Sequence, residues 1–168
     1  CLLELNQNGL LEGGSYYEFG LFRGYALWFV QDLVRRLGIR DFHCHGFDSF
    51  AGLPKPDGID DPSPWSEGDF AVSKAQVERN LTEFNADFSR ISLYEGFFSD
   101  DLFNKLRSEV KFGKAALVLV DCDLYASTVP VLKFIRPLLA NGTRLLFDDY
   151  DCFSASDDRG QRRALREF

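Results

Sequence analysis

Apolar residues along this chain alternate between short continuous runs and longer stretches with helical spacing. The clearest run, residues 115–120, is apolar throughout, which is typical of a central parallel strand buried on both faces. In residues 25–37, Leu27, Val30 and Val34 share one face of a helix. The predicted strands are 16–21, 42–47, 91–94, 115–120 and 143–147. The predicted helices are 25–37, 73–84, 100–110, 127–139 and 157–168.

Strands that alternate with helices predict a Rossmann-like α/β fold, with a mostly parallel sheet and helices on both of its faces. Ligands of such folds bind at the carboxyl ends of the strands, near the point where the strand order reverses. A chain of 168 residues without internal repeats fits one domain, residues 1–168.

Charge and composition narrow the classes of partner. Acidic residues outnumber basic ones by 26 to 19, and the formal net charge of −7 argues against binding to a nucleic-acid backbone. No apolar run is long enough to span a bilayer, and the N-terminus lacks the pattern of a signal peptide. None of the four cysteines forms a Cys-x-x-Cys pair, so we expect reduced thiols, as is typical of a cytoplasmic protein.

A long irregular segment, residues 49–70, separates the second predicted strand from the next helix. It contains four of the six prolines and a tryptophan, Trp65. A loop of this length in a compact domain is usually functional or disordered. Two interpretations stay open, a packed surface loop and a lid over a substrate pocket.

A glycine-containing turn follows the first predicted strand. The segment 18–24 reads EFGLFRG, and glycines let the backbone turn tightly and approach a ligand closely. Asp48 ends the second strand, where an acidic residue of a dinucleotide-type fold accepts hydrogen bonds from ribose hydroxyls. The two features together suggest a ligand with an adenosine moiety. Each is also compatible with an ordinary turn.

Acidic residues follow the fourth and fifth predicted strands. If these strands are neighbours, Asp121, Asp148 and Asp149 meet at one edge of the sheet. Carboxylates held that close repel one another unless protons or a cation compensate, and hard oxygen ligands favour Mg²⁺ or Ca²⁺. The alternative is that the carboxylates point apart into solvent or cap the following helices. We favour the metal site, because the cluster lies where such folds bind ligands.

Other candidate chemistry is weaker. His43 and His45 face the same side of a strand and could bind a metal, but such residues are more often packed and hydrogen-bonded, and we predict the latter. Ser127 lacks the G-x-S-x-G context of a serine hydrolase nucleophile. The glycine turn lacks the Gly-Lys-Ser/Thr ending of a nucleoside triphosphatase loop.

Six segments together resemble the macrocin-O-methyltransferase family, over the chain from about Gly14 to Phe168. They are EFGLFRG (18–24), FDSFAGLP (47–54), GDF (68–70), DCDLYAST (121–128), FDDY (147–150) and GQRRA (160–164). The resemblance implies a class I enzyme that depends on S-adenosylmethionine and Mg²⁺ and methylates sugar hydroxyls of natural products. The D-x-D-x-Y-x-S-T and D-D-Y segments are its most specific parts.

The resemblance also implies roles for single residues. Glu18, Gly20 and Gly24 would shape the cofactor loop, Asp48 would hold the ribose, and two residues after the third strand would lie near the adenine. The cofactor-binding set is Glu18, Gly20, Gly24, Asp48, Ser49, Gly96 and Phe97. The metal ligands would be Asp121, Asp148 and Asp149, with Asp121 and Asp149 as the catalytic residues. The metal would bind two neighbouring hydroxyls of the acceptor and lower the pKa of the reacting one.

One feature departs from the family pattern. Class I methyltransferases usually have two further strands at the sheet edge, and this chain ends in the helix before them. We therefore expect a domain shortened at its C-terminus. An uncovered sheet edge invites pairing with another chain, which predicts a homo-oligomer or an aggregation-prone fragment.

Three functions compete at this stage. The first is Mg²⁺-assisted methyl transfer from S-adenosylmethionine to a hydroxylated, sugar-like small molecule. The second is a nucleotide-dependent oxidoreductase, which the spacing G-x-x-x-G in place of G-x-G-x-x-G disfavours. The third is a non-catalytic module of the same fold that binds a nucleoside without turnover.

Overall fold

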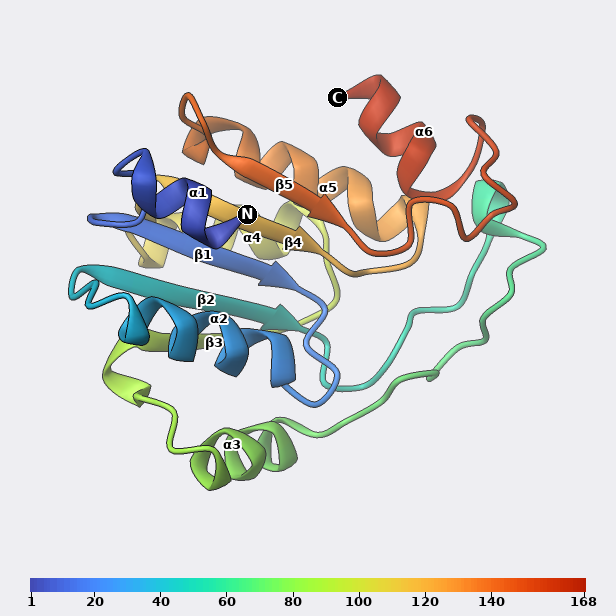
Figure 1. Ribbon diagram of the computed structural model, residues 1–168. Coiled ribbons are helices and arrows are strands. Elements are labelled where there is room, and N and C mark those ends of the chain that lie inside the picture. The colour runs from blue at the N-terminus through green and yellow to red at the C-terminus, as the bar shows by residue number, and fades with distance from the viewer.

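In a computed structural model that describes residues 1–168, the chain forms one five-stranded sheet (Figure 1). All four strand pairings are parallel, and the spatial order is β3-β2-β1-β4-β5. The order reverses between β1 and β4, so the carboxyl ends of these two strands are the expected place for a ligand. The strands are β1 (Gly14–Phe19), β2 (Phe42–Asp48), β3 (Ile91–Glu95), β4 (Ala115–Val120) and β5 (Arg144–Phe147).

Six α-helices and three short 3₁₀ helices surround the sheet (Figure 1). The α-helices are α1 (Leu2–Gln7), α2 (Tyr25–Arg36), α3 (Lys74–Glu83), α4 (Asp100–Glu109), α5 (Tyr125–Ile135) and α6 (Gly160–Glu167). The 3₁₀ helices are η1 (Gly58–Asp60), η2 (Phe88–Arg90) and η3 (Arg136–Leu138). None of the helices is both long and apolar enough to cross a membrane.

Two hydrophobic cores lie on opposite faces of the sheet. Successive residues of a strand point to opposite faces, and Tyr16 and Tyr17 of β1 accordingly belong to different cores. The core around Tyr16 includes side chains of α1, α2 and α3. The core around Tyr17 includes side chains of α4, α5 and α6 and is rich in stacked aromatic rings. The prediction of a parallel sheet covered on both faces is confirmed.

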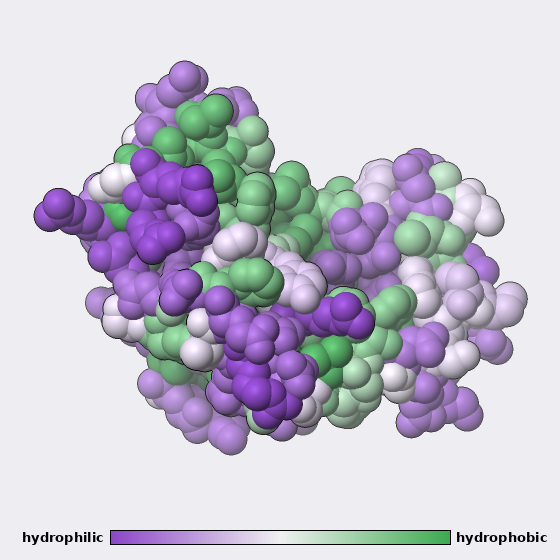
Figure 2. Space-filling view, turned by 60° about the horizontal axis from the view of Figure 1, so that its bottom comes forward, coloured by the Kyte–Doolittle hydropathy of each residue, from purple (hydrophilic) through white to green (hydrophobic).

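The surface is mainly hydrophilic on the face shown in Figure 2, and apolar side chains gather there in smaller patches. Several aromatic side chains are exposed, among them Phe22, Phe29 and Phe84. All four cysteines are free thiols, in agreement with the sequence-based expectation.

The predicted elements are all present, with shifted ends. Ser73 is the N-cap of α3, and its side chain accepts a hydrogen bond from the backbone nitrogen of Gln76. Helix α5 begins two residues earlier than predicted, and Pro130 lies in its second turn. It also ends earlier, at Ile135, and Pro137 lies in the 3₁₀ turn that follows. The short helix α1 was not predicted.

His43 and His45 are packed and hydrogen-bonded, as predicted. The imidazole of His43 lies 2.9 Å from the Ser92 hydroxyl, and that of His45 lies 3.1 Å from the Tyr94 hydroxyl. Burial, followed by the charge of His43, lowers the pKa of His45 to about 3. His45 is therefore neutral in the folded protein at any pH in ordinary use.

This buried imidazole is expected to make the fold sensitive to acid. Unfolded histidine has a pKa of about 6.5, so below that pH the unfolded chain binds a proton that folded His45 refuses. The stabilisation is complete above pH of about 6.5 and is lost as the pH falls toward 3. At pH of about 5 the loss is about 2 kcal/mol. Between pH 7 and pH 5, the free energy of unfolding measured with urea should decrease more for the parent than for His45→Gln. Equal decreases would contradict the lowered pKa of His45.

Candidate active site

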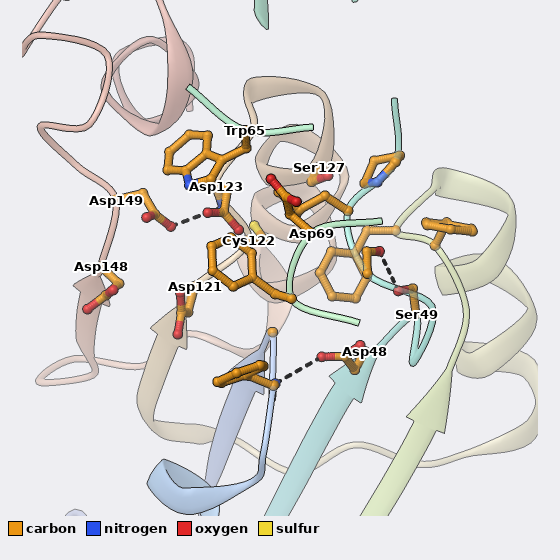
Figure 3. A pocket seen from close by; sticks show the side chains of 18 of the residues that line it. Asp48, Ser49, Trp65, Asp69, Asp121, Cys122, Asp123, Ser127, Asp148 and Asp149 are labelled. Carbon is orange, nitrogen blue, oxygen red and sulfur yellow. Dashed lines mark hydrogen bonds between the residues drawn. The ribbon is translucent and has the colours of Figure 1, made fainter. Parts of the chain in front are cut away.

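A cavity of about 460 Å³ opens at the carboxyl ends of the strands. Its lining comes from the segments that follow all five strands and from the irregular segment 49–70 (Figure 3). Asp48 and Ser49 lie at one end of the cavity, and Asp148 and Asp149 lie at the other. This is the position that the topology predicts for a ligand.

Gly20 brings the ends of β1 and β4 into close contact. Its φ of +97° is unfavourable for residues with a side chain. A Cβ atom at this position would lie 1.6 Å from the backbone oxygen of Asp121. Gly20 lines the cavity, whereas Gly24 does not. Gly24 is the N-cap of α2, and a Cβ atom there would lie 3.0 Å from the Val77 side chain, so Gly24 allows α3 to pack closely.

Asp48 orders the glycine turn through its carboxylate. One oxygen accepts hydrogen bonds from the backbone nitrogens of Leu21 and Phe22 at 2.7 and 3.3 Å. The other accepts one from the backbone nitrogen of Phe50 at 2.6 Å. Ionised carboxylate oxygens can accept more than one hydrogen bond each, so Asp48 keeps capacity for a ligand that enters the cavity. Both sequence-based interpretations of Asp48, a ligand-binding residue and a turn residue, are therefore compatible with this geometry.

Glu18 is buried beneath the cavity and does not line it. Its carboxylate accepts a 2.7 Å hydrogen bond from the Tyr16 hydroxyl. Burial is the main reason that the pKa of Glu18 rises to about 8. Glu18 is therefore part of the buried end of β1, and its assignment to the cofactor-binding residues stays a prediction.

The remaining predicted cofactor residues line the end of the cavity near Asp48. The Ser49 hydroxyl donates to the backbone oxygen of Gly52 at 2.7 Å, which closes a tight turn after β2. Gly96 follows β3 with a φ of +148°, and the Phe97 side chain is half exposed. All three residues belong to the lining.

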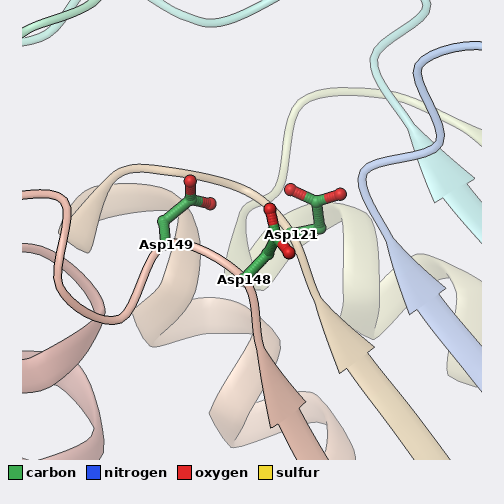
Figure 4. A group of neighbouring side chains, drawn as sticks. All are labelled: Asp121, Asp148 and Asp149. Atoms are coloured by element: carbon green, nitrogen blue, oxygen red, sulfur yellow. The ribbon is translucent and has the colours of Figure 1, made fainter.

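Three aspartates meet at the other end of the cavity (Figure 4). Asp121, Asp148 and Asp149 each offer a carboxylate oxygen, and these oxygens all lie within 4.8 Å of one another. Burial first, and then the charges of Asp148 and Asp149, raise the pKa of Asp121 to about 7. The cluster of oxygens fits a hard divalent cation, which would relieve this repulsion. The alternative in which the carboxylates point apart is not observed.

Two residues near the triad were not assigned a role from the sequence. Asp123 has a positive φ of 60° and a buried side chain that lines the cavity. Burial, followed by the charge of Asp149, raises the pKa of Asp123 to about 8. Its backbone nitrogen donates to the Asp149 carboxylate at 3.0 Å. The second residue is Gln161, from α6.

Gln161 joins the ends of β4 and β5. Its side chain is fully buried, and the side-chain nitrogen donates to the backbone oxygen of Val120 at 3.1 Å and to the Asp149 carboxylate at 3.4 Å. Its side-chain oxygen accepts from the backbone nitrogen of Asp149 at 3.2 Å. Gln161 therefore orients one member of the acidic triad, as outer-shell groups do around bound metals. Gln161 belongs to GQRRA (160–164), one of the six segments that carry the family resemblance, but the sequence alone gives no reason for its role.

The irregular segment 49–70 is packed and also forms a wall of the cavity. It folds back on itself, because the backbone nitrogen of Leu53 donates to the oxygen of Asp69 at 2.9 Å, and that of Gly68 to the oxygen of Leu53 at 2.9 Å. Leu53, Trp65, Asp69 and four other residues of the segment line the cavity. The segment is therefore a packed loop, as the first interpretation predicts. It also borders the cavity that a lid would cover, as the second interpretation requires.

Comparisons with known proteins agree with this picture. The model of the family described as Macrocin-O-methyltransferase (TylF) matches residues 1–168. Mycinamicin III 3''-O-methyltransferase of Micromonospora griseorubida is 28% identical over 163 residues, which cover 92% of this chain and 60% of that protein. The 8-demethyl-8-(2,3-dimethoxy-alpha-L-rhamnosyl)-tetracenomycin-C 4'-O-methyltransferase of Streptomyces olivaceus is 28% identical over 144 residues, covering 82% of this chain and 53% of that protein.

Among solved structures, CalS11, a calicheamicin methyltransferase, superposes with a TM-score of 0.78 at 27% identity. The match covers 99% of this chain and 68% of that one. The chain thus spans somewhat more than half the length of the curated relatives that it matches.

Proposed function

Because the chain belongs to the macrocin-O-methyltransferase (TylF) family, we propose that it is the S-adenosylmethionine-binding domain of an O-methyltransferase. The acceptor would be a hydroxyl of the sugar-like part of a small molecule, and Mg²⁺ would assist the transfer. One observation carries the proposal: Gly20 of the glycine turn, Asp48 and the aspartate triad all line a single cavity. We also propose that residues 1–168 form a single domain.

The cofactor would occupy the end of the cavity lined by Gly20, Asp48, Ser49, Gly96 and Phe97. Gly20 presents backbone without a side chain, which allows close approach of the cofactor. The Asp48 carboxylate, already fixed by the glycine turn, is a rigid acceptor for ribose hydroxyls. S-adenosylmethionine supplies the electrophilic methyl group when bound. The residues at this end bind and orient it toward the triad.

Mg²⁺ would be held by Asp121, Asp148 and Asp149, whose oxygens are already gathered and hard. A bound Mg²⁺ lowers the pKa of a hydroxyl that it contacts and orients it. Gln161 keeps Asp149 in place for this task. We propose Asp121 and Asp149 as the catalytic residues, because Asp149 is buried and Asp121 is half-buried, whereas Asp148 is exposed.

The lining also favours an acceptor of a particular charge. Six aspartates line the cavity, and no lysine, arginine or histidine does. Even with a divalent cation and a sulfonium present, negative charge would remain in excess. A neutral or amine-bearing sugar unit suits this end of the cavity, and a diphosphate, such as that of the TDP-rhamnose named for CalS11, would have to lie outside it. Trp65 and Phe70 add apolar surface for a sugar ring or its aglycone.

Isothermal titration calorimetry with S-adenosylhomocysteine, with and without Mg²⁺, tests the cofactor part. We expect a micromolar dissociation constant. No heat under either condition would mean that the glycine turn is only structural in this chain. Binding without methyl transfer to any sugar-containing acceptor would favour the non-catalytic module instead, and fluorescence titration with reduced nicotinamide cofactor tests the oxidoreductase alternative.

A further inference from the structure

The irregular segment 49–70 is anchored at its far end by a buried carboxylate. It runs from the end of β2 across the carboxyl edge of the sheet to the start of α5, where η1 lies, and returns to α3 (Figure 1). Asp60, the last residue of η1, is 1% exposed. A carboxylate is rarely buried to this extent unless its charge is compensated.

The N-terminus of α5 provides that compensation. One oxygen of Asp60 accepts from the backbone nitrogen of Tyr125 at 2.8 Å, and the other accepts from that of Ala126 at 3.0 Å. The N-cap residue of α5 itself, Leu124, has no side chain that can cap. Asp60 therefore caps the helix from a segment that lies more than 60 residues earlier in the chain.

Arg159 binds the same part of the segment. Its guanidinium donates to the backbone oxygens of Ile59 and Pro62 at 3.1 and 2.5 Å. It also lies 4.7 Å from the centre of the Phe153 ring. Trp65 packs edge-on against that same ring, with centroids 5.5 Å apart.

These contacts connect the segment to the aspartate triad. Helix α5 begins directly after the turn that contains Asp121 and Asp123. The backbone amides that Asp60 caps are the first two of this helix, so they follow that turn directly. Trp65, five residues after Asp60, lines the cavity beside Asp123 (Figure 3). The cofactor end, in contrast, is organised by Asp48 and makes no use of this anchor.

We propose that Asp60 is a positioning residue for the methyl-transfer reaction, which fastens segment 49–70 to α5 so that Trp65 closes the acceptor end of the cavity. The role in the reaction rests on the proposed function, whereas the anchor rests on the contacts between Asp60 and the start of α5. Arg159 is the second fastening of the same segment. Neither residue touches the reacting atoms.

The matched substitutions are Asp60→Asn and Asp57→Asn, in a Trp28→Phe background that leaves Trp65 as the only tryptophan. Both remove one carboxylate from the same segment, but Asp57 is exposed and its side chain makes no hydrogen bond within the chain. In Asp60→Asn one of the two cap bonds is lost, because the NH2 group of the new side chain faces a backbone N–H of α5. The segment should then be held less firmly, and we expect the acrylamide quenching constant of Trp65 to rise at least about twofold. It should stay unchanged in Asp57→Asn.

Two further readouts separate positioning from general stability. The affinity for S-adenosylhomocysteine should stay within about twofold of the parent, whereas the KM for methyl α-L-rhamnopyranoside, used as the test acceptor, should rise at least about tenfold at saturating S-adenosylmethionine. Unchanged quenching in Asp60→Asn, or equal losses of both affinities, would overturn the proposal. If Asp60→Asn does not fold, Arg159→Gln must show the same separation.

Failure of the proposed function has a different signature. In that case the parent would transfer no methyl group to the test acceptor, while the quenching comparison would still decide whether Asp60 anchors the segment. Raised quenching in Asp60→Asn with an inactive parent would support the anchor and count against the reaction.

Discussion

Gly20→Ala is expected to lose about 4 kcal/mol or more of unfolding free energy, because Gly20 has the closest approach to a neighbouring atom of all the glycines in the chain. The new Cβ atom would lie 1.6 Å from the backbone oxygen of Asp121, far inside the contact distance of the two atoms. Relief requires β1 and β4 to move apart, yet Phe19 and Asp121 are joined there by a 2.8 Å backbone hydrogen bond. Since domains of this size have only about 5–15 kcal/mol of stability, the variant should be poorly folded.

Gly38→Ala is the matched control for this experiment. Gly38 also has a positive φ, +77°, but no atom lies within 4 Å of the added Cβ. Its substitution carries the backbone cost alone, about 1 kcal/mol. Urea unfolding followed by circular dichroism compares the two variants. Similar midpoints for both would show that the contact between Gly20 and Asp121 is not tight in solution.

The strands and the triad could be predicted because each depends on a simple geometric rule. Residues 115–120 are apolar without interruption, and a short run of this kind is typical of a strand buried on both faces. Asp121 and Asp148 each directly follow a strand, and parallel neighbours end at the same edge, so the two carboxylates had to meet if β4 and β5 paired.

The supporting residues could not be predicted because their partners are distant in sequence. Gln161 binds the backbone of Val120, 41 residues earlier, and nothing in its neighbourhood on α6 indicates a buried amide. Asp60 caps a helix 65 residues away, in a segment whose composition indicates only a loop. The contact of Asp48 with the glycine turn is similar, because it joins segments that follow two different strands.

Asp121→Asn is expected to abolish the proposed metal site while it stabilises the metal-free protein. Burial and the charges of its neighbours raise the pKa of Asp121 from its ordinary value to about 7. At a pH between the ordinary pKa of an aspartate and 7, Asp121 holds a proton in the folded protein and has released it in the unfolded chain. The free energy of unfolding therefore falls as the pH rises toward 7. An amide cannot ionise, and the metal-free variant should therefore unfold at a higher urea concentration than the parent at pH 8.

Added Mg²⁺ should stabilise the parent and not the Asp121→Asn variant, in contrast to the metal-free comparison, which favours the variant. Mg²⁺ is expected to raise the Tm of the parent and to leave that of Asp121→Asn nearly unchanged, because one of three gathered carboxylates is gone. The Mg²⁺ affinity should fall at least about 100-fold, and methyl transfer about 1,000-fold, with S-adenosylhomocysteine affinity retained. Asp101→Asn, which removes an exposed carboxylate on α4, should behave as the parent does. A variant that is more stable without metal and unresponsive to it would identify Asp121 as a metal ligand, since a carboxylate with a purely structural role would lose stability under both conditions.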